Sequence, residues 1–142
     1  MVPDTISEEL KVPGTISVSV SIDVPKLADG VRFYEAAFGF VKVAEPMPGI
    51  AVLRAGQAEI CLLEKAPGSS PSSQTGEKRH YGRHWTPVHM DLHVDDLKSV
   101  LARAITAGAK QEQLFENPKY PSVAFCSDPF GHGFCLIERR KK

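Results

Sequence analysis

Apolar and polar residues alternate strictly in two stretches of the chain, residues 16–24 and 88–94. A period of two predicts a β-strand with one buried face. After each stretch the apolar spacing changes to three and four, which predicts amphipathic helices over about residues 26–38 and 95–108. The two predicted strands end on the same residue type, at Val24 and Val94. The chain therefore contains the same strand–helix unit twice.

The expected helices carry boundary signals of their own. Asp95 or Asp96 can cap the second helix, because a carboxylate accepts the unpaired N–H groups of a first turn. Gly39 and Gly108 follow the two helices, and glycine adopts the left-handed backbone of a helix C-terminus without steric cost. These signals support the helical interpretation independently of the apolar spacing.

The two halves also end alike. ICLLEK at residues 60–65 corresponds to FCLIER at residues 134–139, with Cys61 and Cys135 at the same place in the pattern. The separation between Cys61 and Cys135 is four positions longer than the separation between Val24 and Val94, and loops can absorb that difference. We infer an internal duplication of one α+β module of roughly 70 residues. Further strands are predicted at residues 41–44, 49–55, 58–64, 111–114, 122–126 and 133–138, and residues 128–131 have the composition of a turn.

The chain divides into four segments that together form one compact domain. These are an N-terminal arm (1–14), a first module (15–65), a linker (66–86) and a second module (87–140). The linker is rich in Gly, Pro, Ser and Thr, and its last part is basic and aromatic. One interpretation is a solvated connection, with Trp85 packed at the start of the next strand. The other is a lid whose Arg79, His80, Arg83 or His84 meets an anionic ligand.

Length, net charge, apolar runs and cysteine count argue against several classes of function. The chain has 142 residues, with Lys+Arg and Asp+Glu both 17, so no global field favours nucleic acid or a membrane surface. No apolar run approaches the ~20 residues that span a bilayer, and the N-terminus does not resemble a signal peptide. Three cysteines without CxxC spacing indicate reduced thiols, and we expect a cytoplasmic protein.

The duplicated module resembles a known family. The first helix ends in an FY…G pattern (Phe33, Tyr34, Gly39), and the second half contains VHMDLHVDDLKSVLARAITAGA followed by DPFGHGFCLIE. Over residues 15–140 the chain resembles glyoxalase-like members of the glyoxalase/bleomycin resistance/dioxygenase group, the vicinal oxygen chelate superfamily. The resemblance implies an α+β fold of two βαβββ modules, each with a curved mixed sheet that forms a cup and a helix outside it.

The resemblance also implies where a metal would bind. Metal-dependent members use one His from the first strand and one Glu from the last strand of each module, and these positions fall on Ser19, Cys61, His89 and Cys135. His89 alone keeps the expected residue type and is our tentative metal ligand. A set of thiols, imidazole and hydroxyl suits zinc or another thiophilic ion. We therefore expect either no cofactor or one divalent metal ion outside the standard two-His, two-Glu pattern.

Glu64 and Glu138 lie three positions beyond the two cysteines. Because three is odd, their side chains point to the opposite face of their strands and cannot replace the missing ligands without a register shift.

Side-chain parity predicts a pocket. If Ile16, Val18 and Val20 face the first helix, and Val88, Met90 and Leu92 the second, the intervening residues face the cup. Trp85 and residues 78–84 then lie near its mouth. The predicted ligand-binding residues are Ser19, Ser21, Cys61, Trp85, His89, Asp91 and Cys135. His89 has two possible roles: a pocket histidine bonded to Asp91 or a serine, or a group that contacts ligand, transfers protons or binds metal. The cysteines can equally be small lining or core residues.

Three functions remain open from the sequence. The first is a small-molecule-binding protein with most metal-ligand positions replaced, and the second is a metal-dependent lyase, isomerase or dioxygenase that uses His89. The third is a structural or partner-binding subunit. We also predict a homodimer, because half-cups leave strand edges uncovered, and we expect those edges at residues 50–53 and 123–125.

Overall fold

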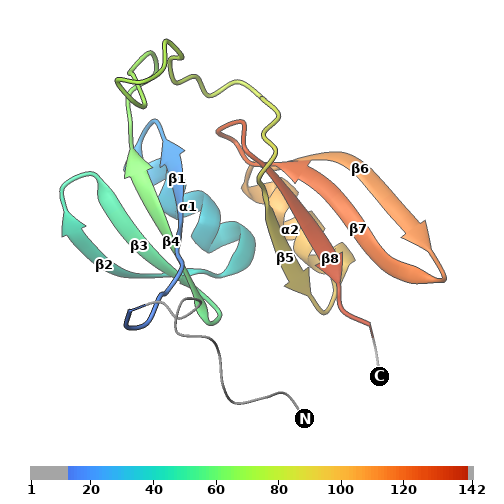
Figure 1. Ribbon diagram of the computed structural model, residues 1–142. Coiled ribbons are helices and arrows are strands. Elements are labelled where there is room, and N and C mark those ends of the chain that lie inside the picture. The colour runs from blue at the N-terminus through green and yellow to red at the C-terminus, as the bar shows by residue number, and fades with distance from the viewer. Residues whose placement is uncertain (1–12, 141–142) are drawn as a thin grey trace.

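A computed structural model describes residues 13–140, so most of the predicted arm lies outside the described residues (Figure 1). The first module contains β1 (Val20–Val24), α1 (Leu27–Phe38), β2 (Val41–Met47), β3 (Ile50–Ala55) and β4 (Ala58–Glu64). The second contains β5 (Met90–Val94), α2 (Leu97–Ala107), β6 (Lys110–Asn117), β7 (Tyr120–Ser127) and β8 (Gly133–Glu138). The predicted α+β fold of two βαβββ modules is confirmed. None of the described helices is long and apolar enough to cross a membrane.

Each module forms a four-stranded mixed sheet with the same topology. The strand orders are β1-β4-β3-β2, here called sheet A, and β5-β8-β7-β6, called sheet B. In both sheets the first strand pairs in parallel with the last, and the registers correspond: Val20 pairs with Ile60, and Met90 with Phe134. The prediction that residues 50–53 and 123–125 form edges is wrong, because β3 and β7 are interior strands.

The first strand of each module is shorter than its alternation predicts. Ile16, Val18 and Val88 are 72%, 83% and 81% exposed and do not pack on the helices, contrary to the parity prediction. For Ile16 and Val88 the reason is the length of the neighbouring strand. Met90 pairs with the second residue of β8 and Val20 with the third residue of β4, so Val88 and Ile16 lie beyond the first residues of those strands, whereas Val18 lies beside Ala58, the first residue of β4.

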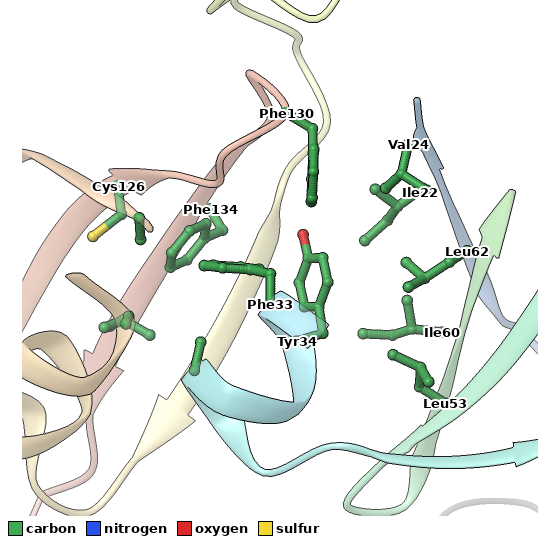
Figure 2. Close-up of a cluster of buried hydrophobic side chains, with 14 of the residues drawn as sticks. Ile22, Val24, Phe33, Tyr34, Leu53, Ile60, Leu62, Cys126, Phe130 and Phe134 are labelled. Atoms are coloured by element: carbon green, nitrogen blue, oxygen red, sulfur yellow. The ribbon is translucent and has the colours of Figure 1, made fainter. Parts of the chain in front are cut away.

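The helices lie between the two sheets and share one core. In Figure 2 side chains from β1, β3 and β4 point toward α1 from one side, while Phe130 and Phe134 approach it from the other. The rings of Phe33 and Phe130 are 6.3 Å apart, and those of Phe38 and Phe134 are 5.4 Å apart. Each sheet thus has one face on this shared core and one open face that points away from it.

Two glutamates, one in each module, anchor the helices to the sheets. The Leu27 N–H, at the start of α1, donates to Glu64 Oε2 at 2.8 Å, and the Leu97 N–H, at the start of α2, donates to Glu138 Oε1 at 3.1 Å. Each carboxylate meets an N–H group of a first turn, where negative charge is favourable. Asp96 also caps α2 through its own side chain, as predicted. The glutamates therefore face the helices, as their parity predicts, and take no part in the open faces.

A buried hydrogen bond fastens the second module's turn to the first module's helix. The Tyr34 hydroxyl donates to Asp128 Oδ2 at 2.6 Å, and both residues are buried. Asp128 Oδ1 accepts the backbone N–H groups of Phe130 and His132, which closes the predicted turn. Burial raises the pKa of Tyr34 well above its ordinary value, and the neighbouring Asp128 carboxylate raises it further. The turn motif thus has a structural role at the junction of the modules.

Candidate functional site

Three polar side chains converge on the open face of sheet B. The imidazole and carboxylate of His89 and Asp91 and the sulfur of Cys135 lie within 4.8 Å of one another. His89 Nε2 is 3.1 Å from Asp91 Oδ1. Asp91 and Cys135 are direct neighbours across β5 and β8, and the alternating residues Phe134 and Leu136 face the core. The strand register therefore produces this cluster, which we call the His–Asp–Cys cluster.

Asp91 is the central member of the cluster. Burial raises the pKa of the Cys135 thiol to about 11, and the charge of Asp91 and a hydrogen bond to it add to that rise. Cys135 is consequently a thiol at neutral pH and a donor to the Asp91 carboxylate. His89 and Asp91 are about half exposed, with side-chain exposures of 46% and 45%. The cluster thus combines two accessible groups with one buried sulfur.

A cavity of about 120 Å³ adjoins the cluster, and its lining includes Arg83, Trp85, His89, Glu112, Phe125 and Cys135. Trp85 is 80% exposed, so it lies at the mouth and is not packed at the start of β5. Arg83 forms two hydrogen bonds with Glu112, at 2.5 and 3.0 Å. Hydrogen bonding to Arg83 is the main cause of the lowered pKa of Glu112. The linker therefore contributes two side chains to the cavity: Arg83, whose charge is balanced by Glu112, and the exposed ring of Trp85.

Other linker residues contact one module or the other. Arg79 forms an ion pair with Asp23 at 2.7 Å, and the Tyr81 hydroxyl donates to the Lys65 carbonyl. The His84 ring lies between those of His80 and His132, at centroid distances of 4.9 and 5.5 Å. His132 Nε2 is 2.7 Å from the Asp23 carbonyl oxygen. Of the four residues considered for a lid, Arg83 lines the cavity of about 120 Å³ beside the cluster, and His84 lines a second cavity together with His89.

The first-module residues of the predicted pocket lie on sheet A. Ser21 pairs with Cys61 across β1 and β4, in the same register as Asp91 and Cys135. Ser19 lines a separate cavity with Arg54 and Glu59, whereas Ser21 and His89 both line a cavity of about 370 Å³ near β1 and β5. Because the open faces of the sheets lie on opposite sides of the shared core, one chain does not join both faces into a single cup (Figure 1).

Sequence reasoning missed Glu112 and Phe125. Phe125 faces Cys135 across β7 and β8, and it could have been found by extending the parity argument to β7. Glu112 lies at a register shift of β6, between Gln111 and Gln113. A bulge of this kind has no clear signal in the amino-acid pattern, so the direction of Glu112 could not be predicted.

The duplicated βαβββ modules and their open sheet faces define the class of protein. The sequence matches the glyoxalase-like domain family over residues 19–137. The chain therefore belongs to this family, within the vicinal oxygen chelate superfamily. No curated protein matches the sequence.

Solved structures share the fold over most of their length. Fosfomycin resistance protein FosX from Listeria monocytogenes has a TM-score of 0.67 at 13% identity, covering 92% of this chain and 96% of its own. A glyoxalase/bleomycin resistance protein/dioxygenase family enzyme from Burkholderia phytofirmans has a TM-score of 0.65 at 19% identity, with coverages of 84% and 95%. Lactoylglutathione lyase from Agrobacterium tumefaciens has a TM-score of 0.60 at 15% identity, with coverages of 89% and 95%. At these identities the similarity establishes the fold.

Proposed function

We propose that this protein binds a small molecule on the open face of sheet B, with His89 as the principal polar contact. The observation that carries the proposal is the convergence of His89, Asp91 and Cys135 beside a cavity. A concave site with a few convergent polar groups is the usual form of a ligand pocket. The resemblance assigns Ser19, Cys61 and Cys135 to the superfamily's ligand positions in place of His and Glu, and we take this assignment as support for binding over the standard metal chemistry.

The lining suggests the chemistry of the ligand. Trp85 and Phe125 offer exposed aromatic surface at the cavity, and the His89–Asp91 pair can meet a polar group. Arg83 is already paired with Glu112, so the site does not present a free cation there. A flat, largely apolar molecule with one hydrogen-bonding group fits this combination, because aromatic rings favour stacked or edge-on contacts.

We propose further that the protein is a homodimer. The apolar residues Ile16, Val18 and Val88 precede the first strands and are exposed, as are Val43, Phe115 and Phe125 on β2, β6 and β7. A second copy that packs its sheet A against sheet B would cover such residues and bring Ser19, Ser21 and Cys61 toward His89. Analytical ultracentrifugation at micromolar concentration should show a dimer, and a monomer would refute this assembly.

Native mass spectrometry of gently purified protein tests the binding proposal. We expect a retained small molecule, which after identification is titrated back into ligand-free protein. His89→Ala should weaken its binding by about 1–3 kcal/mol, because a polar contact is lost or left unpaired, with little change in stability. His80→Ala is the matched control, since His80 is an exposed linker histidine outside the cluster. Equal losses in both variants, or unfolding of His89→Ala, would contradict the proposal.

A second function, that of a metal-dependent lyase, isomerase or dioxygenase, is favoured by the His–Asp–Cys cluster itself. Elemental analysis of protein purified without an affinity tag is the direct measurement, and stoichiometric metal that disappears in His89→Ala would support it. If neither metal nor small molecule is retained, a structural or partner-binding subunit becomes the better interpretation. We place the protein in the cytoplasm, because Cys61, Cys126 and Cys135 are free cysteines.

A further inference from the structure

We propose that the cleft between the two modules is a second ligand site, which takes a small molecule with an apolar body and one carboxylate. A cavity of about 620 Å³ lies there, and its lining comes from β1 and β4 of the first module, from β5 of the second and from both helices. Ligand pockets commonly measure about 300–1,000 Å³. The cavity shares one lining residue, His89, with the cavity beside Trp85, because β5 is an edge strand. The site does not depend on the function proposed above.

The cavity arises because the two helices pack differently on their sheets. α1 contacts all four strands of sheet A, including β1, whereas α2 packs chiefly on β6, β7 and β8. Gly30 of α1 lies close against β1, since a Cβ at this position would meet the Val24 side chain at 3.0 Å. Val100 takes the equivalent place in α2, because each residue is the fourth of its helix. The isopropyl group of Val100 prevents the same close approach of α2 to β5.

The core-facing side of β5 is consequently left partly open. Val94 is only partly buried, whereas Val24, at the same position of β1, is fully buried. Leu92 is likewise partly buried, whereas its counterpart Ile22 is 7% exposed. Leu92, Val94 and Phe38 all line the cavity, so their uncovered apolar surface faces it. An apolar ligand would remove this surface from water, which is favourable.

Arg103 of α2 supplies a positive charge to the same cavity. Its Nε donates to the Ala36 carbonyl oxygen at 2.6 Å, which holds the guanidinium beside the last turn of α1. The other N–H groups of Arg103 have no carboxylate partner within residues 13–140. Arg139 also lines the cavity, but it is paired with Asp95 at 3.0 Å. Because arginine binds carboxylates through parallel N–H donors, Arg103 is suited to hold the anionic end of a ligand.

The acidic residues of the lining leave Arg103 available. Asp91 is 3.1 Å from His89, on the open face of sheet B. Glu59 directly precedes Ile60, which faces the core, so alternation along β4 turns Glu59 toward the open face of sheet A. A single carboxylate matches the one guanidinium without an ion-pair partner, whereas a phosphate dianion would bring a second negative charge. An apolar chain or ring with one carboxylate therefore fits both the walls and the charge of the cleft.

Isothermal titration calorimetry of the full-length protein with octanoate, and with 1-octanol as the uncharged analogue, tests the site. We expect one octanoate per chain, bound more tightly than 1-octanol. Arg103→Gln should weaken octanoate binding by at least about tenfold, because a charged hydrogen bond is lost, and should leave 1-octanol binding unchanged. Arg103→Lys keeps the charge and should restore part of the octanoate affinity. Arg32→Gln is the matched control, since the Arg32 side chain is 73% exposed on α1 outside the cavity.

Val100→Phe fills the cavity and should abolish binding of both probes, whereas Trp85→Ala, in the cavity on sheet B, should change neither. The inference is overturned by any of three results: no octanoate binding at millimolar concentration, equal losses of both probes in Arg103→Gln, or octanoate binding that is lost in Trp85→Ala. If Val100→Phe misfolds, the comparison of Arg103→Gln with Arg103→Lys decides. A retained small molecule that requires His89, in protein that binds no octanoate, would refute this second site and leave the proposed function standing.

Discussion

Replacing Tyr34 with phenylalanine tests how the two modules are joined. The change removes only the hydroxyl that donates to Asp128 Oδ2 at 2.6 Å across the junction. Asp128 Oδ1 keeps its two backbone donors, while Oδ2 is left without its tyrosine partner in a residue that is 4% exposed. Hydrogen bonds to charged groups contribute about 1.5–3 kcal/mol, so we expect a loss of that size in the free energy of unfolding.

The same hydrogen bond predicts an alkaline dependence of stability. The pKa of Tyr34 is raised in the folded protein, so above about pH 10 the unfolded state gives up this proton while the folded state retains it. The contribution is fully present below pH 10 and is lost as pH rises from there toward the folded pKa. The difference between wild type and Tyr34→Phe should therefore shrink above pH 10.

Urea unfolding at pH 7.5 and at several pH values above 9.5 measures both effects. Tyr120→Phe is the matched control, because Tyr120 is 67% exposed. Substitutions at exposed positions usually change the free energy of unfolding by no more than about 0.5 kcal/mol. If the unfolding free energies of the two variants differ by no more than this at pH 7.5, the hydrogen bond does not help to join the modules. A difference that stays constant to high pH would contradict the linkage argument.

Two further predictions concern the scaffold, and urea unfolding checks both. Glu64→Ala should destabilise the protein by about 0.5–2 kcal/mol and Glu138→Ala by less, because α2 keeps its Asp96 cap while among the described residues Lys26 gives α1 no side-chain cap. The reverse order would refute this account. Gly131→Ala should cost on the order of 3 kcal/mol or more, because its φ is +86° and a Cβ would overlap the Gly82 carbonyl oxygen. Gly56→Ala, with φ +64° and open space, isolates the backbone contribution of about 1–2 kcal/mol, and an equal cost at both sites would rule out the steric contact.

The sequence predicts the fold well because its signals are local and occur twice. The period-two strands, the helical stripes and Gly39 and Gly108 are each readable within a short window, and the duplication repeats them. Signals that depend on a neighbouring strand were less predictable. Val88 continues the alternation of β5, yet by the β5–β8 register it lies beyond the start of β8, and it is 81% exposed. The same limit explains why β3 and β7, predicted as edges, are interior strands.

The sequence predicts which residues of the second module share one sheet face, but it does not predict whether the first-module residues join them. Parity alone identifies His89, Asp91 and Cys135 as residues of one sheet face, and the β5–β8 register brings them together. Parity also identifies Ser21 and Cys61, but it cannot say whether their sheet faces the same cavity. That depends on how the modules pack, which is decided by the aromatic residues of α1 and by the buried Tyr34–Asp128 contact. Ser21 already shares a cavity with His89 within one chain, whereas the approach of Ser19 and Cys61 to His89 remains a prediction about the homodimer.

A comparison of the modules separates what the fold requires from what function requires. Both modules contain the glutamate that meets the helix N-terminus, the glycine that ends the helix and a cysteine at the same strand position. The helix contacts and the glycine backbone are demands of the βαβββ module, so any copy that folds must meet them. An imidazole beside a carboxylate is not such a demand, because Ser19 and Ser21 occupy those positions in a module with the same topology. His89 and Asp91 are therefore the residues whose presence the fold leaves unexplained, and the ligand binding that we propose on the open face of sheet B would account for both.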